Sequence, residues 1–169
     1  MTMFETPRLR VREFQPEDAA FILELVNEPD WLRFIGDRGI RDLDAAGRYI
    51  VDGPRAMQVK HGFALWCVEP RTGGAPLGMC GLIKRDTLEH VDIGFAFLAR
   101  HRGLGYAREA AQGTLEQAGV LGLKTLAAIT DPANVRSIHL LESLGFRFQG
   151  RRSLTPGAQE LSIYLRQAE

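Results

Sequence analysis

The sequence predicts a single α+β domain with a mixed β-sheet, and three observations support this fold class. The apolar segments at residues 62–69, 77–84 and 89–99 are joined by connections too short to contain a helix, which indicates an antiparallel meander. A segment with helical periodicity then separates the last of them from another apolar segment at 123–130, which indicates a parallel strand pair. The length of 169 residues suits one domain with a buried core, so we expect residues 1–169 to form one domain.

The composition is that of an ordinary soluble globular protein, with 45% hydrophobic and 25% charged residues. Lysine plus arginine equal aspartate plus glutamate at 21 each, so the chain lacks the basic excess that broad nucleic-acid binding requires. No segment approaches the ~18 consecutive apolar residues of a membrane span, and the N-terminus has no secretory apolar region. We therefore expect a cytoplasmic protein with no nucleic-acid and no membrane partner.

The cysteines and histidines show no metal-binding pattern. Cys67 and Cys80 lie within apolar segments without CxxC spacing, which favours small buried hydrophobic side chains over a disulfide or a metal site. His90 and Asp92 would share one strand face, but two such residues alone do not make a metal site. We expect no metal.

The N-terminal third predicts one strand and two helices. Residues 8–14, RLRVREF, alternate polar and apolar side chains as in a short strand with one exposed face. Residues 15–18 open a helix, because a proline in the first turn and acids near the positive end of the dipole favour a helix start. A second helix is expected at 43–51, stopped by Gly53-Pro54. The first helix has an apolar stripe of Ala19, Ile22, Leu23 and Val26.

The remaining elements complete the sheet. The meander strands are almost continuously apolar, which predicts a sheet covered on both faces. A helix follows residue 105 and ends near Gly119 to Gly122, and a further helix carries Ile138, Leu141 and Leu144 on one face with Gly145 as its C-terminal cap. Segments 146–151 and 159–166 form the last two strands around the Thr155-Pro156-Gly157 turn.

The segment RHRGLGYAREA, residues 100–110, places three arginines, a histidine and two glycines at the start of a predicted helix. Glycines let the backbone turn tightly and approach a ligand closely. The first N–H groups of a helix have no acceptor within it and lie at the positive end of its dipole. The segment therefore predicts a site for an anion, most often phosphate.

Two common phosphate motifs do not fit this loop. No GxxxxGK[ST] string is present anywhere in the chain, which excludes a Walker loop. A dinucleotide fingerprint needs glycine or alanine where Arg108 stands, and it belongs near the start of a βαβ unit rather than after a meander.

A third motif fits every position. Residues 102–107, RGLGYA, match the [Q/R]-x-x-G-x-[G/A] signature of the GCN5-related N-acetyltransferase (GNAT) superfamily. Residues 5–14, ETPRLRVREF, with Asp18 resemble the opening of its ribosomal-protein N-acetyltransferase-like (RimJ/RimL-type) branch. Residues 91–111 resemble the family's fourth strand and loop-helix, and residues 134–146 resemble its Asn-x-x-Ser…Leu-Gly-Phe segment. The resemblance covers essentially the whole chain in family order.

The resemblance implies a fold and a ligand. The GNAT fold has a mixed, twisted, seven-stranded sheet flanked by about four helices, with the fourth and fifth strands splayed apart. The implied ligand is acetyl-CoA, with CoA as product, and its pantetheine arm would pair with the fourth strand in this gap. Gly94 in that strand is consistent with a bulge or with close backbone approach. The cofactor-binding residues implied are Phe95, Ala96, Phe97, Leu98, Arg102, Gly103, Leu104, Gly105, Tyr106, Ala107, Arg108, Asn134 and Ser137.

The implied reaction, acetyl transfer from a thioester to an amine, needs a base because an ammonium group has no lone pair for attack. Asp92 is the candidate base, or else an acid paired structurally with an arginine; Glu89, His90 and Glu160 are alternatives. No GxSxG elbow or Cys–His pairing is evident, in agreement with direct attack in a ternary complex.

Ser137 is the candidate acid for the leaving thiolate, because it occupies the serine position of the resemblance's Asn-x-x-Ser segment. The resemblance assigns Asn134 to a contact with the pantetheine arm. The alternative is that both residues cap a helix start, as asparagine and serine often do.

The sequence does not determine the identity of the amine acceptor or the oligomeric state. The resemblance places acceptor specificity in residues 28–44 and 151–160, where Trp31, Phe34, Asp37 and Arg38 could line a pocket; Trp31 and Phe34 could equally be core aromatics. The branch includes enzymes that act on protein N-termini and others that act on small amines. The chain could be a homodimer, and the alternative to an enzyme is a non-catalytic acyl-CoA-binding sensor of the same fold.

Overall fold

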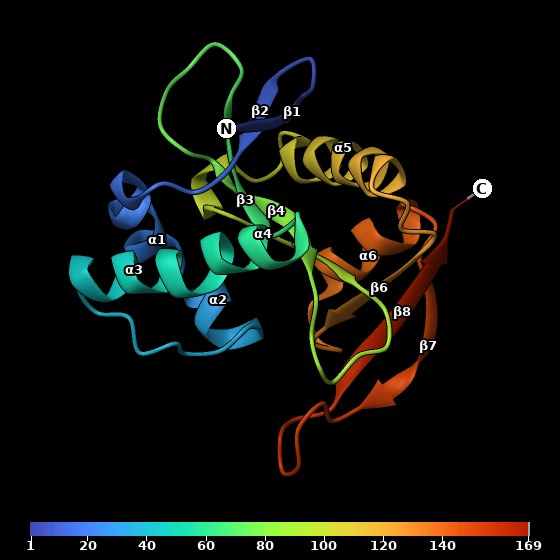
Figure 1. Ribbon diagram of the computed structural model, residues 1–169. Helices are drawn as coiled ribbons and strands as arrows, with labels where there is room; N and C mark the ends of the chain where they lie inside the picture. The colour runs from blue at the N-terminus through green and yellow to red at the C-terminus, as the bar shows by residue number, and fades with distance from the viewer. Residues whose placement is uncertain (169) are drawn as a thin grey trace.

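The computed structural model describes residues 1–168, and these form one mixed sheet with helices on both faces (Figure 1). The strand order is β1-β2-β3-β4-β5-β6-β8-β7. The strands are β1 Thr2–Glu5, β2 Leu9–Arg12, β3 Leu65–Pro70, β4 Gly78–Ile83, β5 Asp92–Phe97, β6 Thr125–Thr130, β7 Arg147–Arg152 and β8 Leu161–Gln167. The helices are α1 Ala19–Leu25, α2 Pro29–Phe34, α3 Leu43–Ile50, α4 Ala56–His61, α5 Tyr106–Val120 and α6 Val135–Ser143.

The pairing of the strands confirms the α+β prediction. Strands β3, β4 and β5 form an antiparallel meander, as their short connections require. Strand β6 pairs with β5 in parallel after the α5 crossover, and β8 then pairs with β6 in the antiparallel sense. The last hairpin, β7–β8, closes the sheet at one edge.

The predicted count of seven strands is wrong, because residues 1–168 contain eight. The additional strand is β1, which pairs antiparallel with β2 at the opposite edge of the sheet. It has only four residues, of which both end residues are exposed and both middle residues are half-buried. Such a segment shows no alternation of buried and exposed side chains that could reveal it in the sequence.

The helix count also differs, with six α-helices among residues 1–168 where about four were expected. The first predicted helix ends at Leu25, and a new helix begins at Pro29. The preceding Glu28 is extended, with φ −67° and ψ 147°, so the chain turns there before α2 starts. Proline is well suited to the first position of α2 because it has no N–H that would need a partner.

The prediction that Gly53-Pro54 stops the second helix is also wrong. The chain passes from α3 through one π-helical turn, Val51–Arg55, directly into α4. Pro54 lacks the N–H that a regular α-helix would use, and a wider turn accommodates the missing bond. The helical path ends only at Gly62, whose φ of +80° is the left-handed conformation of a C-terminal cap.

The sheet separates two hydrophobic cores. In β3, Trp66 and Val68 pack into the core that includes α5 and α6, whereas Cys67 packs into the core under α1, α2 and α3. Both cysteines are buried without a disulfide, and burial raises the pKa of each thiol to about 12. They are the small buried hydrophobic side chains that the sequence predicts. Among residues 1–168, no helix combines the length and apolar character needed to cross a bilayer.

The predicted splay lies between β5 and β6. Their register consists of one pair, Asp92 with Ala127, beside a hydrogen bond of 2.9 Å from the Ala127 N–H to the Val91 carbonyl. Beyond this point the two strands separate into a V. The bulge considered at Gly94 is absent, because β4 and β5 pair there without a shift of register. The close approach is present, since a Cβ on Gly94 would lie 3.1 Å from the Ile83 Cδ1 atom.

Candidate active site

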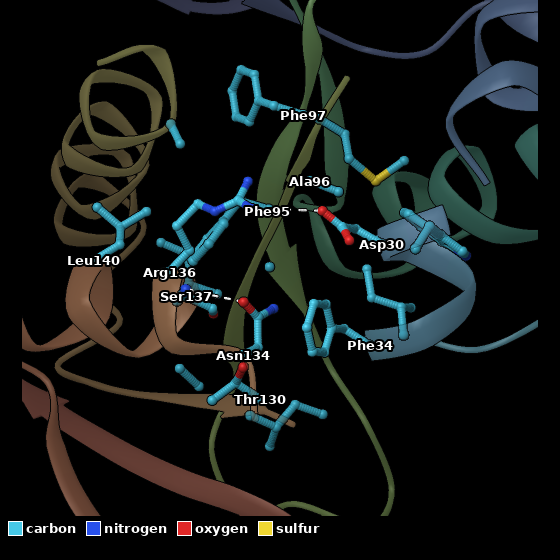
Figure 2. Close-up of a pocket in the computed structure, with 18 of the residues that line it drawn as sticks. Asp30, Phe34, Phe95, Ala96, Phe97, Thr130, Asn134, Arg136, Ser137 and Leu140 are labelled. Carbon is cyan, nitrogen blue, oxygen red and sulfur yellow. Dashed lines mark hydrogen bonds and ion pairs between the residues drawn. The ribbon is translucent and has the colours of Figure 1, made fainter. Parts of the chain in front are cut away.

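A pocket of about 490 Å³ occupies the V between β5 and β6 (Figure 2). Its wall is formed by α2, by β5, by the loop that precedes α5, by the end of β6 and by the start of α6. One cavity therefore joins the predicted phosphate loop to the predicted acceptor residues.

The phosphate end of the pocket is the start of α5. Gly103 and Gly105 have φ of +79° and +83°, a left-handed conformation that favours glycine. The first i→i−4 bond of the helix runs from the Glu109 N–H to the Gly105 carbonyl at 3.1 Å. The N–H groups of residues 106–108 are therefore left without a helical acceptor at the positive end of the dipole, which is a favourable site for an anion.

Arg8 holds this loop in shape, which the sequence did not reveal. Its Nε donates to Glu109 at 2.6 Å, one terminal nitrogen donates to the Leu104 carbonyl at 2.8 Å, and its guanidinium lies 4.6 Å from the centre of the Tyr106 ring. Tyr106 lines the pocket, whereas the Leu104 side chain is 55% exposed and lies outside it. The side chain of Leu104 is therefore not part of the site.

The two loop arginines have protein partners. Arg102 contacts the Asp30 carboxylate at 2.5 Å and the Phe97 carbonyl at 3.1 Å, and lies 3.9 Å from Glu28. Arg108 donates to the Ser143 hydroxyl at 2.6 Å. Both line the pocket. The contacts of Arg102 connect the phosphate loop to α2, so its charge is already balanced by carboxylates of the chain.

Strand β5 offers a backbone edge to the pocket. From Gly94 to Phe97 it pairs with β4 on one side, and among residues 1–168 it has no strand partner on the side facing β6. Phe95, Ala96 and Phe97 line the pocket (Figure 2). Leu98 does not: its side chain is fully buried in the core under α1 and α3, and its N–H donates to the Leu77 carbonyl at 3.1 Å.

Asp92 lies at the vertex of the V, where β5 and β6 meet. Its side chain is 1% exposed, and its Oδ1 accepts a hydrogen bond of 3.1 Å from Nε of Arg85. Burial raises the pKa of Asp92 to about 6, against the lowering effect of the Arg85 charge. The structure therefore shows both features considered for this acid, an arginine partner and a place in the pocket.

The alternative bases lie elsewhere. Glu89 has a side chain 89% exposed, Glu160 is exposed, and neither residue lines the pocket; nor does His90. Of these candidates, the structure brings only Asp92 to the cavity. Within residues 1–168, no group of three or more His, Cys, Asp or Glu side chains could hold a metal ion.

The start of α6 forms the wall opposite α2. The side-chain oxygen of Asn134 accepts a hydrogen bond of 3.3 Å from the Ser137 N–H, which caps the helix, and both residues line the pocket (Figure 2). Capping and a ligand contact are compatible here, since the cap uses the Asn134 oxygen and leaves its amide N–H groups available. Figure 2 also shows Arg136 of α6 facing Asp30 of α2 across the pocket, at 3.8 Å.

The acceptor end carries candidate residues from α2 and from the loop that follows it. Trp31, Phe34 and Arg38 line the pocket, and Trp31 is also part of the core at 6% exposure, so the two interpretations of this aromatic residue coincide. Asp37 lies outside the cavity and pairs with Arg41 at 2.5 Å. Further lining residues come from elements far apart in the sequence, namely Tyr49, Arg85, Leu154 and Leu161.

Several of these residues could not be predicted from the sequence, because their partners lie on other parts of the chain. Arg8 and Arg136 lie within the motifs that carry the family resemblance, but their partners lie on other elements. Arg85 stands in a turn, and only the β4–β5 hairpin brings it back to Asp92. The short connection between β4 and β5, which spans residues 84–91, is the one signal that could have suggested this pair.

Known proteins are similar to this chain in sequence. The family model for the acetyltransferase (GNAT) domain matches residues 8–147. The uncharacterized protein YkkB of Bacillus subtilis (strain 168) is 28% identical over 171 residues, covering 99% of this chain and 96% of that protein. The uncharacterized N-acetyltransferase p20 of Bacillus licheniformis is 25% identical, covering 89% of this chain and 85% of that protein.

Solved structures agree on the fold. An acetyltransferase from Agrobacterium tumefaciens str. C58 superposes with a TM-score of 0.82 at 23% identity, covering 99% of this chain and 95% of that one. RimL, a ribosomal L7/L12 alpha-N-protein acetyltransferase in complex with coenzyme A, also has a TM-score of 0.82, at 12% identity and 99% and 98% coverage. The family match spans most of the chain and the fold agrees with it, so the chain belongs to the GNAT acetyltransferase family and is an acetyltransferase.

Proposed function

We propose that this enzyme transfers the acetyl group of acetyl-CoA to a primary amine by direct attack in a ternary complex. The observation that carries the proposal is the continuity of the pocket, which runs from the N-terminus of α5 along the open edge of β5 to Asp92. An anion site, an extended backbone edge and a buried carboxylate thus follow one another in a single cavity.

The residues present suit acetyl-CoA. The N–H groups at the start of α5 would hold its pyrophosphate, and Gly103 leaves open space there, since a Cβ on it would have no neighbour within 4 Å. The edge of β5 from Gly94 to Phe97 would pair with the pantetheine arm, and the free amide group of Asn134 would donate to it. When bound, acetyl-CoA supplies the thioester that is cleaved.

Asp92 would be the general base. A carboxylate with a pKa of about 6 is ionised at neutral pH and can accept the proton that the amine nitrogen loses as it attacks the thioester. Arg85 would hold the carboxylate in place through its Nε. Ser137, on the first turn of α6, would donate a proton from its hydroxyl to the leaving sulfur.

We also propose that residues 1–169 act as one domain, as a monomer or a homodimer, without nucleic acid or a membrane as partner. The balance of 21 basic and 21 acidic residues supports the first exclusion. Because acetyl-CoA is an intracellular metabolite, we place the enzyme in the cytoplasm.

Initial-velocity kinetics test the proposed function. Coenzyme A release would be measured while acetyl-CoA and a primary amine are varied, and the product would be identified by mass spectrometry. We expect intersecting double-reciprocal lines and no acetylated enzyme, because no covalent intermediate is needed. Parallel lines with an acetylated enzyme would contradict direct attack. Tight acetyl-CoA binding without transfer to any primary amine would favour a sensor of the same fold.

A further inference from the structure

We propose that the acceptor is a small amine that carries a carboxylate close to its amino group, and that Arg38 and Arg85 receive this carboxylate. The proposal rests on the function proposed above and concerns the acceptor end of the pocket. Hydrogen-bond donors without an acceptor and the order of charges along the wall support it.

Two guanidinium groups at this end have N–H donors without a hydrogen-bond acceptor. Arg85 donates to Asp92 through Nε alone, and within residues 1–168 its two terminal nitrogens make no hydrogen bond. Arg38 is an exposed residue of the loop after α2 that lines the pocket, and it makes no hydrogen bond or ion pair within the same residues. By contrast, Arg102 at the phosphate end is already paired with Asp30.

Tyr49 of α3 lines the cavity with these two arginines. Its hydroxyl has no hydrogen-bond partner among residues 1–168. Burial raises the pKa of Tyr49, and the charges of Arg38 and Arg85 oppose the rise, so both guanidinium groups act on this phenol. Two cations and a hydroxyl donor around one space form a site for an anionic oxygen group, and the planar fork of arginine matches a carboxylate.

The position of Asp92 determines where the amine would lie. Its carboxylate is buried and lies 3.1 Å from Arg85, so a negative and a positive group stand side by side on the wall. A ligand complementary to this pair has an ammonium group beside a carboxylate, separated by one or two carbon atoms. An amino acid has this arrangement, whereas the N-terminus of a protein presents a neutral amide to Arg85.

The acceptor end also has an apolar wall, beside the polar residues Thr130 and Asp131 at the end of β6. Trp31 and Phe34 of α2 face this space together with Leu154 and Leu161 from the last hairpin. An amino acid with an apolar side chain would bury that side chain among them. The chemistry of the wall thus specifies an amine, a carboxylate and an apolar group in one small acceptor.

A panel of matched acceptors tests this proposal. Coenzyme A release would be measured with the proteinogenic amino acids and β-alanine, each beside its amide, its decarboxylated amine and a peptide that begins with it. We expect at least one amino acid to exceed its three relatives by about tenfold or more in kcat/KM. Equal or better rates with the amides, amines or peptides would overturn the proposal while leaving the proposed function intact.

The Arg38→Gln variant makes the test specific. We expect it to reduce the preference for the amino acid by about tenfold to a hundredfold, mainly through KM, because a charged hydrogen bond to the carboxylate is lost. Arg48→Gln is the matched control, since Arg48 is exposed on α3 outside the pocket and should leave the preference unchanged. An equal rise of KM for the amide in Arg38→Gln would overturn the proposal.

Thermal unfolding with and without acetyl-CoA separates the two possible failures. Stabilisation by acetyl-CoA, with transfer to amides or amines and to no amino acid, would refute only the carboxylate. The absence of stabilisation together with the absence of transfer to any amine would refute the proposed function itself.

Discussion

Arg85 and Asp92 form a partly buried ion pair at the vertex of the β5–β6 splay, with Nε of the arginine 3.1 Å from Oδ1 of the acid. The two partners differ in burial: the Asp92 side chain is 1% exposed and that of Arg85 is 32% exposed. The acid is therefore poorly solvated, while the cation keeps contact with water. This asymmetry explains why the pKa of Asp92 is raised to about 6 despite its positive neighbour.

The Asp92→Asn variant should lower kcat by about a hundredfold to ten-thousandfold, which is the usual contribution of a positioned base. The wild type should lose activity below its Asp92 pKa of about 6, and the variant should lack this acid limb. The measurement is a pH–rate profile. Asp86→Asn, an exposed acid in the same hairpin, is the control and should behave as the wild type. An unchanged acid limb in Asp92→Asn would show that Asp92 has a structural role and is not the base.

The Arg85→Gln variant should move the acid limb of the pH–rate profile to higher pH. The Arg85 charge lowers the pKa of Asp92, so its removal leaves burial unopposed and the pKa rises above about 6. We expect a displacement of about one pH unit or more. A limb that stays in place, or moves to lower pH, would show that this group does not control the observed titration.

Asp92→Asn should also change the dependence of stability on pH. The folded-state pKa of about 6 exceeds the ordinary value of 3.8, so the native state binds more protons than the unfolded state between these values. The wild type therefore loses stability as pH rises through this window, by up to about 3 kcal/mol, and the asparagine variant does not. Urea unfolding at about pH 4 and about pH 7 should show the variant gaining relative stability at the higher pH. An equal difference at both pH values would contradict the raised pKa.

Gly113→Ala should destabilise the protein, although alanine normally favours a helix. A Cβ at Gly113 of α5 would lie 2.3 Å from the Phe4 ring of β1, so the helix or the strand must move. We expect a loss of about 1–3 kcal/mol in the free energy of unfolding, measured with urea. Gly119→Ala, in the same helix with nothing within 4 Å, should instead gain about 0.5–1 kcal/mol. If Phe4→Leu does not recover part of the loss, the steric explanation is wrong.

The sequence predicts those elements whose periodicity reflects burial on the sheet. Cys67, Met79 and Leu98 share one core while Trp66, Cys80 and Leu82 share the other, so the meander reads as continuous apolar segments. Strand β1 is not predicted because its side chains are exposed or half-buried. The continuation of the helix through Pro54 is not predicted because a π-helical turn leaves no mark in the pattern of residues.

The candidate site is predicted in part for a related reason. The phosphate loop is a local motif, so the glycines and the start of α5 can be located from neighbouring residues alone. The acceptor end depends on tertiary packing, which brings Arg38 of the α2–α3 loop, Tyr49 of α3 and Arg85 of the β4–β5 hairpin to one cavity from distant positions. Arg102 lies in the phosphate-loop motif, yet its guanidinium group pairs with Asp30 of α2. Such pairings follow from tertiary packing and have no local signature.

Calorimetric titration of acetyl-CoA into the wild type and Gly105→Glu tests the central claim most directly. Gly105 begins the helix at φ +83°, and a glutamate there would add strain and a negative charge at the anion site. Gly119→Glu places the same charge at the far end of α5 in open space and is the control. Circular dichroism would verify that each variant is folded. We predict that acetyl-CoA binds the wild type and Gly119→Glu, with affinity for Gly105→Glu reduced about a hundredfold or more. Equal affinity for a folded Gly105→Glu protein would contradict the assignment of the pocket.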